Sequence, residues 1–249
     1  MLFRRIVLHA LLVGAVAGLL LAAVQAWQVV PIIKSAERFE GAAMTVASAT
    51  HAHDHTDAAS DREWEPSDGV ERTAYTLLAD VLVAIGLAMV LLPAMIASLK
   101  YKTNMRLNWR HGLLWGAAGY AVFFLAPGLG LPPEIPGQAA APLEARQMWW
   151  FTAVLCTATG LAGAAFSKSG WRWAFLGLLA VPYLLGAPEG PAIEFPGQPP
   201  EAAAALEELA RQFIGATAIA NGVLWLALGL ASVWAIRRIV PPSHEPVGN

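Results

Sequence analysis

The chain has 249 residues, of which 57% are hydrophobic and only 14% are charged, and its formal net charge is −2. Soluble domains carry about 25% charged residues, so this composition excludes an ordinary water-soluble enzyme. The single cysteine, Cys156, excludes an intrachain disulfide, and the slightly negative charge excludes a basic surface for nucleic acid. The composition therefore predicts an all-α polytopic membrane protein whose surface faces the lipid bilayer.

A helix that crosses the hydrocarbon core of a bilayer needs about 20 mostly apolar residues. Six apolar runs meet or approach this length, and they cover residues 6–30, 74–99, 111–131, 148–166, 172–187 and 213–236. Before the last run, Pro199-Pro200 and the Ala-, Leu- and Glu-rich residues 201–211 predict a helix that continues into the membrane. We predict a single membrane domain over residues 1–240, followed by a short cytoplasmic tail over residues 241–249.

The orientation follows from the basic residues, because Lys and Arg in short loops are retained on the cytoplasmic side. One alternating set of connections holds ten bases and one acid, whereas the other set holds six bases and sixteen acids. This asymmetry predicts that both termini are cytoplasmic. It places three connections outside, at residues 31–73, 127–147 and 188–212.

The N-terminal run has a second interpretation. Arg4-Arg5, an apolar stretch and Val24-Gln25-Ala26 resemble a cleavable signal peptide, whose apolar core is about 7–15 residues long. The run here is longer and continues to Pro31, which favours a retained span. Both interpretations leave the later topology unchanged.

The second and third outer connections share a motif, Glu134-Ile-Pro-Gly-Gln138 in one and Glu194-Phe-Pro-Gly-Gln198 in the other. Each motif is followed by Ala-Arg-Gln at the start of the next run, and the first connection ends comparably in Glu71-Arg72-Thr73. We interpret the six runs as three like-oriented helical hairpins. The Pro-Gly breaks have two interpretations: interrupted helices of the kind that form substrate sites in transporters, or plain extracellular turns.

The first outer connection contains a tract rich in potential metal ligands: His51, His53, Asp54, His55 and Asp57. Imidazole and carboxylate groups bind late first-row divalent metals. The surrounding residues 41–63 have no core-forming pattern, so we expect a flexible outer loop that collects a divalent metal. The alternative is a solvated polar linker whose histidines cluster by chance.

Several charged residues are candidates for a transport path or a gate. Asp80 is the one acid inside an apolar run, and intramembrane acids are functional candidates by default. Glu134 is the second candidate for the path. We expect an outer ion-pair ring with a possible gating role, formed by Glu71, Arg72, Arg146, Glu194 and Arg211.

Glycines spaced along the apolar runs predict close helix packing; they include Gly14, Gly18, Gly116, Gly119, Gly160 and Gly163.

Enzyme motifs are missing from the sequence. There is no HExxH, G-x-S-x-G, P-loop or CxxC motif, so we predict that the protein is not an enzyme.

Four runs carry Trp, Pro, Gly, Glu and Arg at fixed spacings: Trp64-x-Pro66-x-x-Gly69-x-Glu71-Arg72-Thr73-x-Tyr75-Thr76, Trp115-Gly116-x-x-Gly119, Ala126-Pro127-x-Leu129-Gly130-Leu131-Pro132-Pro133-Glu134-x-Pro136-Gly137 and Arg146-Gln147-x-Trp149-Trp150. Together they resemble the CbtA family of proposed cobalt transporter subunits. The resemblance covers roughly residues 1–240. It implies a bacterial inner-membrane protein that imports cobalt for cobalamin synthesis beside a small single-span partner, CbtB.

The leading hypothesis is therefore a permease subunit for a divalent transition metal, with cobalt(II) as substrate and no permanently bound cofactor. Nickel is the alternative metal, since a histidine site binds nickel more tightly than cobalt. The alternative function is a membrane accessory or sensor protein that binds metal without conducting it.

Overall fold

The computed structural model describes residues 2–39, 66–101, 107–167, 170–192 and 194–240, and all regular structure in these ranges is helical. The π-helical segments η1 and η2 and the 3₁₀ segment η3 lie within longer helices. The elements in chain order are α1 (Leu2–Val24), η1 (Gln25–Val29), α3 (Val70–Tyr101), α4 (Trp109–Tyr120), η2 (Ala121–Leu125), α5 (Ala126–Gly130), α6 (Leu143–Phe166), α7 (Arg172–Gly177), η3 (Leu178–Ala180), α8 (Val181–Leu185) and α9 (Pro200–Ile239).

Five continuous helical stretches are long and apolar enough to cross a membrane: Leu2–Phe39, Val70–Leu99, Trp109–Gly130, Leu143–Phe166 and Pro200–Ile239. The fifth predicted span corresponds to a shorter apolar helix, Arg172–Leu185. It ends at Gly186, whose φ of 81° is left-handed and stops the helix. By helix length and composition the chain is a multi-pass membrane protein, and the six-span topology stays a prediction.

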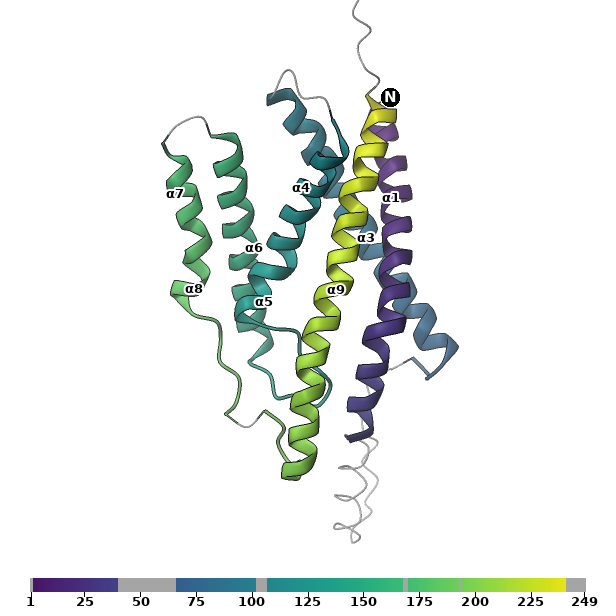
Figure 1. Ribbon diagram of the computed structural model, residues 1–249, viewed down its shortest axis with the longest axis vertical. Helices are drawn as coiled ribbons and strands as arrows, with labels where there is room; N and C mark the ends of the chain where they lie inside the picture. Colours follow the sequence, from purple (N-terminus) through teal and green to yellow (C-terminus); the bar gives the residue numbers. More distant parts are fainter. Residues whose placement is uncertain (1, 40–65, 102–106, 168–169, 193, 241–249) are drawn as a thin grey trace, which may run out of the picture.

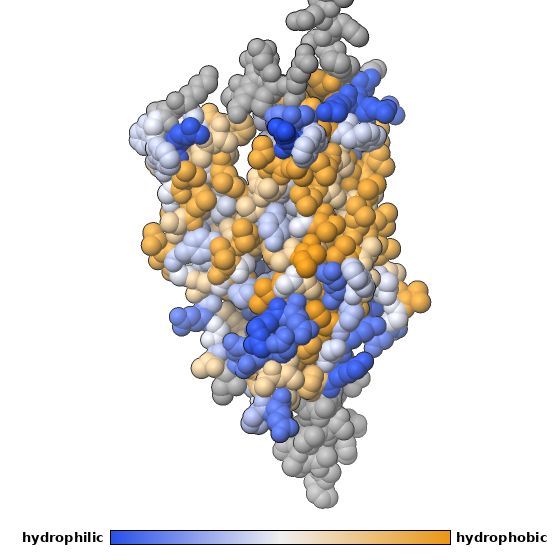
Figure 2. Space-filling view, viewed as in Figure 1, coloured by the Kyte–Doolittle hydropathy of each residue, from blue (hydrophilic) through white to orange (hydrophobic). Residues whose placement is uncertain are grey.

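The helices run side by side along the long axis of the molecule (Figure 1). The N-terminus and the end of α9 lie at one end, and the turns at 131–142 and 186–199 lie at the opposite end, which we call the Pro-Gly end. The buried core is formed mainly by α1, α3 and α9, with Val13, Leu92 and Leu228 fully buried. Figure 2 shows apolar residues over the middle of the visible face and hydrophilic residues toward both ends.

Small residues bring the helix backbones into contact, as the glycine spacing predicted. A Cβ on Gly18 would lie 2.6 Å from the Cα of Val81, and one on Gly14 would overlap Ile85. In the same way, a Cβ on Gly116 would lie 2.5 Å from the carbonyl oxygen of Trp225 in α9. Close approach of this kind stabilises membrane helices through van der Waals packing, because apolar burial gains little in lipid.

The first helix of each of the three predicted hairpins contains an irregular segment. A proline follows two residues after each irregular segment: Pro31 after η1, Pro127 after η2 and Pro182 after η3. Proline lacks an N–H and its ring clashes with the carbonyl four residues earlier, so it disturbs the α-helical hydrogen bonds of the preceding turn. The π and 3₁₀ turns are the local accommodation of that clash.

The two Glu-x-Pro-Gly-Gln motifs form the same turn. Gly137 and Gly197 have φ values of 78° and 79°, and each glutamine N–H donates to the carbonyl three residues earlier. Pro followed by a left-handed Gly is the pattern of a type II turn. The N–H of Ala139 donates to the carbonyl of Glu194 at 2.7 Å, which joins the second and third connections.

Candidate functional site

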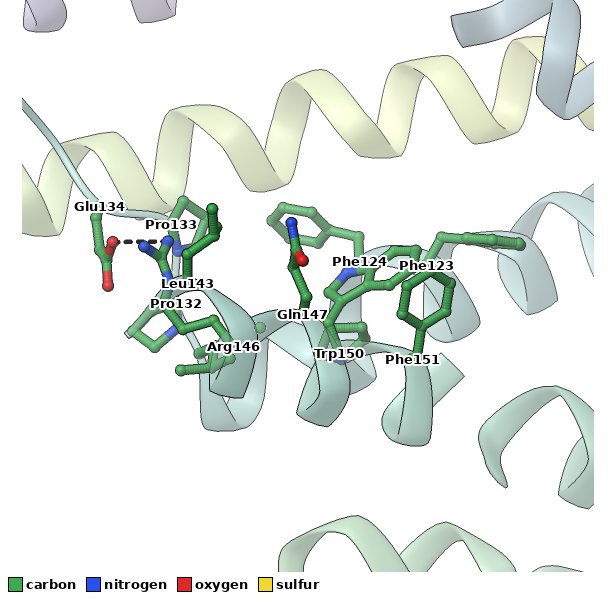
Figure 3. A pocket seen from close by; sticks show the side chains of 13 residues that line it. Phe123, Phe124, Pro132, Pro133, Glu134, Leu143, Arg146, Gln147, Trp150 and Phe151 are labelled. Atoms are coloured by element: carbon green, nitrogen blue, oxygen red, sulfur yellow. Dashed lines mark ion pairs between the residues drawn. The ribbon is translucent and has the colours of Figure 1, made fainter. Parts of the chain in front are cut away.

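A pocket of about 330 Å³ lies between η2–α5 and the first half of α6. Its lining is mainly apolar and aromatic. Figure 3 shows the ion pair of Glu134 and Arg146 at one end, phenylalanines at the other end, and Gln147 between them. The lining residues used in the argument below are Phe123, Phe124, Glu134, Arg146, Gln147 and Trp150.

The ion pair sets the electrostatics of this pocket. The Arg146 guanidinium lies 2.8 Å from the Glu134 carboxylate, and their side chains are 34% and 23% exposed. Glu134 is held by the Pro-rich segment after α5, and Arg146 projects from the first turn of α6. Because the guanidinium compensates the only acid in the lining, the pocket lacks the uncompensated carboxylate and imidazole ligands that a transition metal needs.

A second polar site lies between two helices, where α3 packs on α1. The backbone of Asp80 contacts Gly18, and the Gln25 side-chain amide of η1 hydrogen-bonds the Asp80 carboxylate. Among the residues that the structure describes, the buried Asp80 Oδ2 and Gln28 Oε1 have no hydrogen-bond partner. An intramembrane carboxylate thus has a single amide as compensation.

The expected ion-pair ring is only partly reflected in the geometry. Arg146 pairs with Glu134, whereas Arg211 pairs with Glu208 at 2.6 Å rather than with Glu194. Glu194 points to solvent, and its backbone carbonyl binds Ala139 instead. Arg211 pairs with Glu208 because side chains three residues apart on one helix are close neighbours.

Arg72 joins α3 to the end of the first helix. Its guanidinium pairs with Glu37 and, at 3.2 Å, with Asp68, while Glu71 accepts a hydrogen bond from the N–H of Ser67. The pair of Glu37 and Arg72 therefore brings together the two described ends that flank residues 40–65. Each of the three arginines in the expected ring has its own carboxylate.

The predicted metal ligands His51, His53, Asp54, His55 and Asp57 lie outside the described residues. Within the described ranges, no three His, Cys, Asp or Glu side chains come close enough together to hold a metal ion.

Sequence reasoning missed Gln25, Gln28 and Glu37. The two glutamines are the only amide side chains in the first apolar run, and that pattern was available in the sequence.

Comparison with protein families finds one model that matches residues 3–237, described as "Probable cobalt transporter subunit (CbtA)". No curated protein and no solved structure matches the chain. The match covers every helix, including the Asp80 site and the aromatic pocket. The family is one of transporters and not of enzymes, and its description names cobalt as the transported substrate. The chain therefore belongs to the CbtA family of probable cobalt transporter subunits.

Proposed function

We propose that this chain is a permease subunit that takes up cobalt(II) across the bacterial cytoplasmic membrane and supplies cobalamin synthesis. The observation that carries the proposal is the family match over residues 3–237, on a chain with five helices of spanning length. In the proposed topology both termini are cytoplasmic and Arg172–Leu185 crosses the membrane as the fifth of six spans. A short apolar helix can cross where the bilayer thins locally.

The tract of His51, His53, Asp54, His55 and Asp57 collects the ion at the outer face. Its chemistry supports this role, because imidazole and carboxylate bind divalent transition metals. The neighbouring structure supports it as well: the Phe39 carbonyl, next to residues 40–65, accepts a hydrogen bond at 3.4 Å from Gln198 of the third connection. Phe39, the last described residue before the tract, therefore lies beside the Pro-Gly end, where we expect the ion to enter.

Asp80 is the better of the two candidates for the path through the helices. Glu134 is neutralised by Arg146, so we assign it to fixing the second connection over the aromatic pocket and to a gating role. Asp80 has no basic partner among the described residues: Arg72, Arg146 and Arg211 all pair with other acids. An uncompensated acid attracts a cation in a medium of low dielectric constant.

A second candidate function is a metal-binding accessory protein that presents cobalt, or nickel, to a conducting partner. One observation favours it, since the described residues contain no group of three metal-binding side chains. In both cases we expect a small single-span CbtB-like subunit beside this chain. The two functions differ in whether this chain alone moves the ion.

Uptake of radiolabelled cobalt into vesicles that contain the purified chain separates the two functions. A permease fills the vesicles, and unlabelled cobalt competes. An accessory protein binds cobalt at the surface and leaves the lumen empty, which would overturn the permease proposal.

The role of the tract is tested in the same assay by replacing His51, His53 and His55 with alanine. We expect uptake to fall at nanomolar cobalt and to recover at micromolar cobalt, because the tract concentrates the ion without forming the path. Replacement of Thr45, Ser48 and Thr50 with alanine in the same segment is the matched control. Equal uptake by both triple variants at nanomolar cobalt would remove the tract from the mechanism.

A further inference from the structure

An irregular turn precedes a proline in the first helix of each predicted hairpin. The N–H of the residue before each proline donates outside the α-helical register: Val30 to Gln25, Ala126 to Ala121, and Val181 to Leu178. In each hairpin, the proline also leaves the carbonyl four residues before it without its α-helical donor. A π-turn thus precedes Pro31 and Pro127, and a 3₁₀ turn precedes Pro182.

The side chains at these turns differ. Six and three residues before the proline, the first hairpin has Gln25 and Gln28. The corresponding positions in the other two hairpins are apolar or small: Ala121 and Phe124 in the second, and Leu176 and Leu179 in the third. Only the first turn carries oxygen ligands.

The second helices of the three predicted hairpins show the same difference. Arg72, Arg146 and Arg211 each follow an outer connection, in the first turn of α3, in the first turn of α6 and three turns into α9, respectively. Eight residues later stand Asp80, Val154 and Ile219, respectively. The one intramembrane acid therefore lies in the same hairpin as the two amides, and Gln25 hydrogen-bonds it.

Two side-chain acceptors at the first turn lack donors. Asp80 Oδ2 and Gln28 Oε1 are buried without a hydrogen-bond partner in the described part of the chain. Backbone carbonyls at the turns do have donors: Ser35 donates to Pro31 at 2.8 Å, Tyr183 to Ala126 at 2.8 Å and the Trp149 indole to Pro182 at 3.2 Å. Buried acceptors without donors are costly, and a cation compensates them.

We propose that Asp80, Gln25 and Gln28 form an intramembrane site for a divalent cation at the π-turn of the first hairpin. The site rests on the proposed function, which makes cobalt(II) its occupant. Carboxylate and amide oxygens, completed by water, hold such an ion weakly enough to release it, as a transport path requires. Toward the N-terminal end, α1 and α3 meet backbone to backbone at Gly18 and Gly14, so the site is closed on that side.

Binding of radiolabelled cobalt to the full chain in lipid nanodiscs tests the site by equilibrium dialysis. His51, His53 and His55 are first replaced with alanine, so that only binding outside the histidine tract is counted. We expect this background protein to bind one cobalt ion, and Asp80→Asn and Gln28→Leu to weaken the affinity by about 30-fold or more. Asn221→Leu is the control, because the Asn221 amide binds the Thr217 carbonyl of its own helix at 3.0 Å.

Both Asp80→Asn and Gln28→Leu reduce the polarity of a membrane helix, so neither is expected to prevent insertion. Unchanged affinity in Asp80→Asn, or no saturable binding by the background protein, would overturn the site. Vesicle uptake by the parent chain is measured in parallel. Uptake that survives Asp80→Asn overturns the site and leaves the permease standing, whereas binding without uptake overturns the permease and leaves the site standing.

Discussion

Two acids near the membrane-spanning helices differ in how their charges are compensated. Glu134 lies 2.8 Å from the Arg146 guanidinium at the rim of the aromatic pocket, whereas Asp80 has only the amide of Gln25. The sequence made both acids candidates for the path, with Asp80 the one inside an apolar run, but neither burial nor pairing is visible in a sequence. These different environments support an anchoring role for Glu134 and a role in the transport path for Asp80.

The pairing of Glu134 predicts the behaviour of a double-mutant cycle. Glu134→Gln and Arg146→Gln are each expected to lower thermal stability, because each leaves a partly buried charge unpaired. The double variant should recover part of the loss, with a coupling energy of about 0.5–1 kcal/mol for a pair this exposed. Thermal unfolding in detergent measures the coupling, and strictly additive losses would show that the contact is energetically silent.

Cobalt uptake by Glu134→Gln provides the functional side of this comparison. Since Arg146 already neutralises the carboxylate, uptake should fall much less than in Asp80→Asn. A larger loss in Glu134→Gln than in Asp80→Asn would return Glu134 to the path.

At the scale of the elements, glycine spacing in the sequence predicted which helices approach closely. Gly18 and Gly14 do pack against α3, and Gly116 packs against α9. The π-turns could not be predicted in the same way, because Pro31 looked like the end of the first span. The helix in fact continues to Phe39, since the irregular turn absorbs the proline clash.

The Pro-Gly motifs are a further case in which the sequence was informative about local structure. The sequence left interrupted helices and plain turns open as interpretations of both motifs, and both copies form a turn with the same left-handed glycine. The partner of Arg211 was not predictable from the repeat, because a neighbouring acid on the same helix, Glu208, competes with Glu194. The helix α9 begins at Pro200, well before the apolar run, so Glu208 and Arg211 lie three residues apart on the same helix and are close neighbours.

Packing of α1 on α3 predicts a sharp difference between two glycines. A Cβ on Gly18 would lie 2.6 Å from the Val81 Cα, whereas a Cβ on Gly86 would meet nothing within 4 Å. Gly18→Ala should therefore cost about 1–3 kcal/mol through overpacking, and Gly86→Ala should be neutral or slightly stabilising. Thermal unfolding of both variants in the same detergent checks this, and equal midpoints would contradict the close contact.

The whole molecule separates its charges along the axis of the bundle. The three predicted outer connections contain sixteen acids and six bases, while the predicted cytoplasmic connections contain ten bases and one acid. In the structure the ends of the hairpins do sort this way: Glu134, Glu194 and Glu208 lie toward the Pro-Gly end, and Arg237 and Arg238 end α9 at the opposite end. An acidic outer face raises the local concentration of cations at the entrance of the path.

The charge separation predicts which end of the bundle faces outward. Cys156 is the only cysteine, so Cys156→Ser gives a background in which single cysteines can be introduced. Ser67→Cys lies just before α3 at the Pro-Gly end, and Ser167→Cys lies just after α6 at the N-terminal end. A membrane-impermeant maleimide added to intact spheroplasts should label Ser67→Cys and spare Ser167→Cys, because positively charged loops are retained inside. Both introduced cysteines should react once the membrane is opened, which controls for their accessibility. The reverse labelling pattern in intact spheroplasts would place the histidine tract in the cytoplasm and turn the proposed uptake into export.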